Sequence, residues 1–183
     1  MIELIPFTED DIDRLTRWVP ALEVHLFWTA SVFEYPLPRE PFARFVRESA
    51  ERGDRLIFKA VLVPDTADGA SGEPYGHIEL GAIDRRNRSL RIGRVLVAPA
   101  FQGRGLGEEL MRRAVAYAFD ELGMHRVELG VFDVNPRAIT CYERVGFRSE
   151  GARRESFKAP EGAPMGYWSE LTMSILDSEW RGD

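Results

Sequence analysis

The residues whose types and spacing could do chemistry lie between Gln102 and Gly107, read as Gln-Gly-Arg-Gly-Leu-Gly. They follow an aliphatic run, Arg91 to Val97, that predicts a strand, and Pro99 ends this strand because proline has no N–H to donate. The glycines let the backbone N–H groups of the turn approach a ligand closely. A helical pattern begins next, and the first N–H groups of a helix lack internal partners and carry the positive end of its dipole. The turn therefore predicts a site for an anion, most simply a phosphate.

Two familiar phosphate-binding motifs do not fit this turn. A P-loop ends in Gly-Lys-Ser/Thr, and no lysine is present here. A dinucleotide fingerprint needs Gly-x-Gly-x-x-Gly, whereas the glycines here run Gly-x-Gly-x-Gly. On the glycines alone, a turn that binds nothing remains an alternative.

A second group of chemically capable residues lies downstream, in a predicted helix that begins at Asn135-Pro136 and ends at Gly146. Asn135 and Tyr142 are separated by about two helical turns, so both face the same side. A capping role for Asn135 and a packed core position for Tyr142 are the alternatives to ligand contact.

Together the two groups resemble the GNAT superfamily of N-acetyltransferases. Gln102, Gly105 and Gly107 occupy the three positions of that family's acetyl-CoA motif, Q/R-x-x-G-x-G/A. The downstream residues resemble its N-x-x-A-φ-x-x-Y-x-x-x-G-F block, where φ is apolar; they are Asn135, Ala138, Ile139, Tyr142, Gly146 and Phe147. Within the family, the chain looks similar to the branch that acetylates ribosomal-protein N-termini and small amines.

The resemblance implies acetyl-CoA as cosubstrate, with no metal. It places the pyrophosphate on the turn, formed by Gln102, Gly103, Arg104, Gly105, Leu106 and Gly107. It places the pantetheine arm along unpaired backbone groups of the preceding strand, at Val95, Leu96 and Val97, and against Asn135. Tyr142 would lie near the sulfur and protonate the departing thiolate as a general acid. The Arg104 side chain either adds a charge-assisted contact or faces solvent.

The acceptor is expected to be a primary amine, on a small molecule or a peptide, which must be neutral to attack. A lysine-type amine with a pKa of about 10.4 needs roughly 4.6 kcal/mol to deprotonate at pH 7, against about 1.1 for an α-amine. Glu79 is the candidate general base, with a salt-bridged Glu79 as the alternative, and His77 and Glu128 are weaker candidates. Some GNAT branches carry an acidic base just before an Ile-Gly pair, but here Arg91 holds that position.

Cys141, next to Tyr142, suggests a covalent acetyl-cysteine. Neighbours on a helix point about 100° apart, so the two side chains are not expected to share one site. We therefore interpret Cys141 as a small buried residue.

The elements that must position these residues follow the order β-α-α-β-β-β-α-β-α-β-β. Helices are expected from Thr8 to Val19 and from Arg39 to Arg52, with an irregular aromatic segment at residues 20–38 between them. A turn-rich, mobile connection is expected over Pro64 to Pro74, and a polar tail after Leu176. The order predicts an α/β (α+β) fold: a GNAT-like mixed, largely antiparallel sheet of about seven strands, with helices on both faces.

Length and composition indicate one globular domain, 1–183, without a disulfide framework. The chain has 183 residues, one cysteine and a net charge of −6. The acidic balance argues against a nucleic-acid partner, and no apolar run is long enough for a membrane span. Without a signal peptide we expect a cytoplasmic protein, as a monomer or a homodimer. The leading interpretation is direct transfer of acetyl from acetyl-CoA to an amine; the alternative is a non-catalytic acyl-CoA sensor or scaffold.

Overall fold

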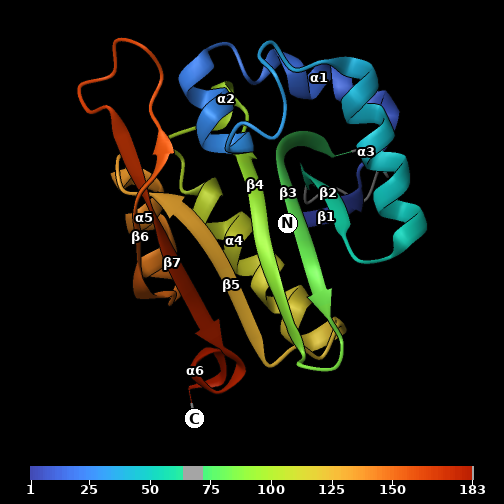
Figure 1. Cartoon of the computed structure of the whole chain (residues 1–183). Helices are drawn as coiled ribbons and strands as arrows, with labels where there is room; N and C mark the ends of the chain where they lie inside the picture. The colour runs from blue at the N-terminus through green and yellow to red at the C-terminus, as the bar shows by residue number, and fades with distance from the viewer. Residues whose placement is uncertain (64–71, 183) are drawn as a thin grey trace.

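The computed structural model describes residues 1–63 and 72–182. A single sheet of seven strands runs through them in the order β1-β2-β3-β4-β5-β7-β6, and only the β4–β5 pair is parallel (Figure 1). The strands are β1 (Ile2–Pro6), β2 (Leu56–Leu62), β3 (Glu73–Asp84), β4 (Ser89–Val97), β5 (Arg126–Phe132), β6 (Arg148–Lys158) and β7 (Tyr167–Leu176). The predicted fold is confirmed: seven strands, largely antiparallel.

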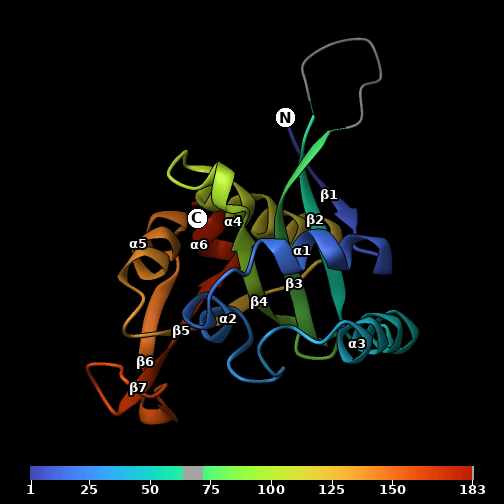
Figure 2. The same ribbon diagram turned by 90° about the horizontal axis from the view of Figure 1, so that it is seen from above.

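Helices cover both faces of this sheet (Figure 2). One face carries three helices from the first third of the chain: α1 (Ile12–Arg17), α2 (Leu22–Thr29) and α3 (Arg39–Arg52). The other face carries α4 (Leu106–Ala116), which contacts β1, β3 and β4, with α5 (Pro136–Val145) beside it. A short helix, α6 (Asp177–Arg181), follows β7.

The apolar stripe predicted for α4 forms the centre of the larger core. Leu110, Met111, Ala114 and Val115 are fully buried and pack on the sheet. Phe42 and Val46 of α3 bury the opposite face in a second cluster, which also takes in Trp28 of α2. The sheet is therefore fixed from both sides, which holds β4 and its neighbours rigidly.

Two helices were missed by the sequence interpretation. Residues 20–38 were expected to be irregular, but Leu22–Thr29 form α2. The helix gives no single apolar stripe because Trp28 packs into the α1–α3 cluster while Leu26 and Phe27 pack toward β5 and β7. Its N-cap, Ala21, also supplies no side-chain hydrogen bond. The polar tail contains α6, which is too short for helical periodicity to show.

The connection expected over Pro64 to Pro74 falls at 64–71 outside the described residues, and β3 already begins at Glu73. Among the described residues, no helix is both long and apolar enough to cross a membrane. Nor do three His, Cys, Asp or Glu side chains gather, within 1–63 and 72–182, where they could hold a metal ion. The expectation of no metal stays a prediction.

Candidate active site

A groove opens in the middle of the sheet, where β4 and β5 separate. The two strands pair only from Ser89–Arg126 to Ile92–Leu129, and beyond this point they diverge (Figure 1). The next residues of β4 pair with β3 on one side only, since Leu96 lies opposite His77 and Val97 opposite Gly76. The resulting groove has a volume of about 790 Å³ and is lined by β4, the glycine turn, α4 and α5. Val95, Leu96 and Val97 all line it, and their contact with a pantetheine arm stays a prediction.

The glycine turn forms one end of this groove. Gly105 is the N-cap of α4 and has a φ of +77°, in the left-handed region that glycine adopts without strain. In the described part of the chain, the N–H groups of residues 103–107 donate no backbone hydrogen bond, because the first capping bond comes from Glu108. The turn is exposed, and Gln102 donates its side-chain amide to the Val97 carbonyl at 3.1 Å. Free donors at a helix N-terminus suit an anion.

Arg104 does not line the groove, although its five neighbours in the turn all do. Its guanidinium lies over the Phe101 ring, 5.3 Å from the ring centroid. The geometry therefore supports only a backbone role for Arg104.

The opposite wall of the groove carries Asn135 and Tyr142 of α5. The Asn135 side chain caps the helix by accepting the Ala138 N–H at 3.2 Å, so its capping role holds whether or not it contacts a ligand. Tyr142 lines the groove and packs against Phe147, with ring centroids 6.2 Å apart. Burial raises the pKa of Tyr142 above its usual value, so the phenol keeps its proton at neutral pH.

Cys141 lines the same groove as Tyr142, so the expectation that the two could not share one site is wrong. Consecutive residues of α5, from Thr140 to Tyr142, line the groove. Burial, and next the negative charge of Glu108, raise the pKa of the Cys141 thiol. A thiol that holds its proton is a poor nucleophile, which argues against a covalent acetyl-cysteine.

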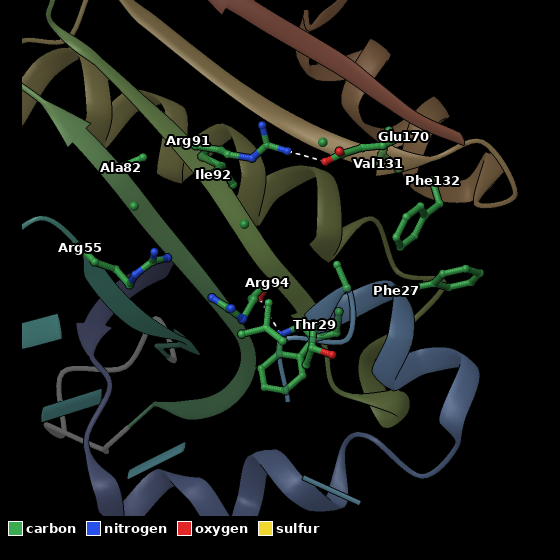
Figure 3. Close-up of a pocket in the computed structure, with 16 residues that line it drawn as sticks. Phe27, Thr29, Arg55, Ala82, Arg91, Ile92, Arg94, Val131, Phe132 and Glu170 are labelled. Carbon is green, nitrogen blue, oxygen red and sulfur yellow. Dashed lines mark hydrogen bonds and ion pairs between the residues drawn. The ribbon is translucent and has the colours of Figure 1, made fainter. Parts of the chain in front are cut away.

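A second, smaller cleft of about 260 Å³ adjoins the groove (Figure 3). We call it the arginine cleft because Arg55, Arg91 and Arg94 line it. It shares several lining residues with the groove, so the two spaces lie side by side; these are Phe27, Trp28, Ile92, Gly93, Arg94 and Gly130. The junction lies where β4 and β5 separate.

Glu79, the predicted base, is fully buried and lines neither space. Its Oε2 accepts hydrogen bonds from Arg55 at 2.8 Å and from Arg94 at 2.6 Å. Both bonds are charge-assisted ion pairs, and the carboxylate opens on neither the groove nor the arginine cleft, so an acceptor amine in either space does not contact it. The geometry therefore favours the structural alternative, an ion-paired Glu79.

His77 and Glu128, the two weaker candidates for the general base, line neither the groove nor the cleft. Burial lowers the pKa of His77, which donates its Nδ1 proton to the Arg94 carbonyl at 2.8 Å. Glu128 is paired with Arg91 at 3.6 Å and with Arg126 at 3.2 Å.

Several lining residues were not identified from the sequence. Val24, Phe27 and Trp28 reach the groove from α2, and Arg137 and Arg144 reach it from α5. The aromatic residues were visible in the sequence, but the segment that carries them was expected to be irregular rather than helical. The two arginines lie in the second motif block and add positive charge to the groove.

Comparison with known proteins decides the family. The profile described as "Acetyltransferase (GNAT) family" matches residues 24–147. The chain belongs to the GNAT acetyltransferase family. The two motif blocks predicted this membership, and they also predicted an acetyl-CoA-dependent N-acetyltransferase.

Relatives of this GNAT acetyltransferase include enzymes named for amine acceptors. The chain is 38% identical to spermidine N(1)-acetyltransferase of Vibrio cholerae over 132 residues. This alignment covers 72% of the chain and 69% of the relative. It is 32% identical over 113 residues to the putative ribosomal N-acetyltransferase YdaF of Bacillus subtilis, covering 61% and 58%. The solved spermidine N-acetyltransferase of Vibrio cholerae with CoA and spermine superposes with a TM-score of 0.83 at 23% identity, over 98% of both chains. This last likeness confirms the GNAT fold.

Proposed function

We propose that residues 1–183 act as one domain that moves an acetyl group from acetyl-CoA directly to a primary amine in a ternary complex. The observation that carries the proposal is that Gly93, Arg94 and Gly130 line both the groove and the arginine cleft, which places the two spaces side by side. A thioester that enters along the groove and an amine that enters from the cleft would meet at this junction. Reacting groups held at one junction need no covalent enzyme intermediate.

In this proposal the cofactor spans both walls of the groove. Its pyrophosphate binds the free N–H groups of residues 103–107. The pantetheine arm pairs with the open edge of β4 at Val95–Val97 and passes Asn135 on α5. Arg137 and Arg144 add positive charge near the phosphates.

The chemical step breaks the thioester C–S bond and forms an amide bond. The neutral amine nitrogen attacks the carbonyl carbon, and the sulfur leaves with the electron pair of the C–S bond. Tyr142 donates its phenolic proton to that sulfur, which leaves as the thiol. The nitrogen, made acidic by acylation, then releases a proton that restores the phenol. No side-chain base is needed if the amine arrives neutral, which favours an acceptor with a low pKa.

Replacing Tyr142 by phenylalanine tests this proposal. We expect kcat to fall by about 10²-fold or more, because general acid catalysis contributes on the order of 10²–10⁴. The dissociation constant for acetyl-CoA should stay within about twofold, since the ring and its packing remain. Thiol release and calorimetric titration measure the two quantities.

Tyr117→Phe is the matched control, because Tyr117 packs on Phe58 at 5.2 Å and does not line the groove. Unchanged turnover in Tyr142→Phe would remove Tyr142 as the acid. Acetyl-CoA binding without turnover of any amine by the unmodified protein would favour the acyl-CoA sensor instead. The cytoplasmic location and the oligomeric state stay predictions.

A further inference from the structure

The arginine cleft carries more positive than negative charge. Among the described residues that line it, Arg55, Arg91 and Arg94 are cationic and Glu170 is the one carboxylate (Figure 3). Glu34, on the segment after α2, is exposed and does not line the cleft. This balance is unexpected in a relative of spermidine acetyltransferases, because spermidine is a polycation.

The excess positive charge comes from Arg55 and Arg94, which share one buried carboxylate. Both direct Nη1 at Oε2 of Glu79, and the neighbouring His77 is uncharged because burial lowers its pKa. The Nε atoms of both arginines are buried without a hydrogen-bond partner. The side chains of Arg55 and Arg94 keep 26% and 13% of their surface exposed, so a molecule in the cleft can reach them.

Aromatic packing holds these two guanidiniums in place. The guanidinium carbons of Arg94 and Arg55 lie 4.8 Å and 5.2 Å from the centroid of the Phe45 ring. Arginines fixed in this way lose little rotamer entropy when an anion binds. The pair therefore forms a preorganised site rather than two mobile surface side chains.

Arg91 adds a third donor at the open side of the cleft. It donates to Glu170 at 2.6 Å and lies 3.6 Å from Glu128, and its Nη2 lies so close to Gly130 that an added Cβ there would clash with it. Glu170 is also bound by Arg153 at 3.1 Å, so the carboxylate of the cleft is already paired twice. The Arg91 side chain stays 38% exposed. An incoming ammonium group would thus find no unpaired carboxylate among the described lining residues.

We propose that the acceptor carries a carboxylate close to the amine that is acetylated, and that Arg55, Arg91 and Arg94 bind this carboxylate. The inference rests on the proposed function and names its acceptor class: a free amino acid or a short acidic peptide, rather than a polyamine. Arginine binds carboxylates with a fork of parallel donors, which suits this role. A volume of about 260 Å³ favours a small acceptor.

The same charges would assist the chemistry. A cation within several ångströms disfavours the protonated amine and lowers its pKa. An α-amine starts near a pKa of about 7.8, so a modest decrease leaves it neutral at pH 7. The acceptor amine would therefore be neutral in the cleft, and Glu79 would not be needed as a general base.

The test is a substrate panel measured by release of CoA thiol. The panel pairs L-amino acids with their carboxamides, which keep the amine and lose the charge, and adds acidic dipeptides and spermidine. We expect a carboxylate-bearing acceptor to exceed its carboxamide by about tenfold or more in kcat/KM, the size typical of a lost charged hydrogen bond. Comparison of amino acids with dipeptides distinguishes the two sources of the carboxylate.

Arg91→Gln should raise KM for the carboxylate-bearing acceptor by about tenfold, with kcat within about threefold and the carboxamide unaffected. Arg91 is chosen because removing Arg55 or Arg94 would leave Glu79 buried with one partner fewer, which threatens folding. Arg153→Gln is the matched control: Arg153 shares Glu170 but does not line the cleft, so neither substrate should respond.

The outcomes separate the two proposals. Turnover of spermidine or of carboxamides at or above the rate of the carboxylate forms overturns this inference and leaves the proposed function standing. Equal effects of Arg91→Gln on both members of a pair also overturn it. If no amine of the panel causes release of the CoA thiol, the proposed function itself is refuted.

Discussion

At the scale of single residues, the carbonyl of Arg94 organises the junction between groove and cleft. It accepts two hydrogen bonds of 2.8 Å, from the Trp28 indole and from His77 Nδ1. Arg94 has a φ of +45°, which costs a non-glycine residue free energy and persists only where the surroundings fix it. Residues of α2 and β3 thus hold the point where β4 turns its edge toward the groove.

The raised pKa of Tyr142 has a consequence for the pH profile. An ordinary tyrosine loses its proton near pH 10, whereas burial keeps this phenol protonated beyond that value. We expect kcat/KM to rise as the amine deprotonates and then to show no decline up to about pH 10. Initial rates from pH 6 to 10.5 measure this, with circular dichroism to verify that the protein stays folded. A descending limb with an apparent pKa below 10 that disappears in Tyr142→Phe would contradict the assignment.

At the scale of elements, the glycine turn combines two separate demands on its glycines. Gly105 needs the left-handed backbone at the N-cap of α4. Gly107 lies inside α4, where an added Cβ would meet only Val97 Cγ2 at an ordinary 3.7 Å. The first glycine serves the turn itself, and the second keeps the surface of the helix N-terminus clear for a ligand.

Gly107→Ala should therefore weaken acetyl-CoA binding without harming the fold. Alanine favours a helix over glycine by up to about 1 kcal/mol, so the melting temperature should stay or rise. The affinity for acetyl-CoA should fall by about tenfold or more, because the methyl group stands where the phosphate would approach the N–H. Calorimetric titration and thermal unfolding measure the two effects, and unchanged affinity would count against the phosphate site.

Gly105→Ala should lower the melting temperature, in contrast to Gly107→Ala. Its left-handed φ costs alanine about 1–2 kcal/mol of stability, whatever space is available. Gly123→Ala is the control, because Gly123 has a φ of +64° and open space but lies away from the groove. It should destabilise the protein similarly and leave acetyl-CoA binding unchanged.

At the scale of the whole molecule, the groove divides the sheet into two parts whose strands pair along one short stretch. β4 and β5 pair over only four residues each, from Ser89 to Ile92 and from Arg126 to Leu129. Apart from this pairing, α4 and α5 contact each other across the back of the sheet. In the proposed complex, acetyl-CoA would lie between the two parts and contact both.

Acetyl-CoA should therefore stabilise both walls together. At one hundred times its dissociation constant, a ligand adds about 2.7 kcal/mol of stability, which corresponds to roughly 5–10 °C in a chain of this size. Thermal unfolding over a range of acetyl-CoA concentrations measures this shift. Amide hydrogen exchange should show protection of residues 102–107 and 135–142 in parallel, and protection of one wall alone would contradict the spanning arrangement.

Much of the architecture was predictable because the signals are local. Gly53 and Gly146 end α3 and α5 in the left-handed conformation, and Asn135 begins α5 as a cap. Alternation of Val127, Leu129 and Val131 gave β5 its bounds. The apolar stripe of α4 faces the core as its spacing required. Each of these depends on neighbours within a few residues.

The sequence by itself determined the family, the fold and the glycine turn, since periodicity, caps and motif spacing are properties of short stretches of chain. Only the tertiary structure decided which partners each charged side chain contacts. It paired Glu79 with Arg55, which immediately precedes β2, and with Arg94 of β4, and it brought three arginines to one cleft. It also placed α2 beside the groove. A helix that packs apolar residues on several sides has no single apolar stripe, so its sequence pattern does not predict it.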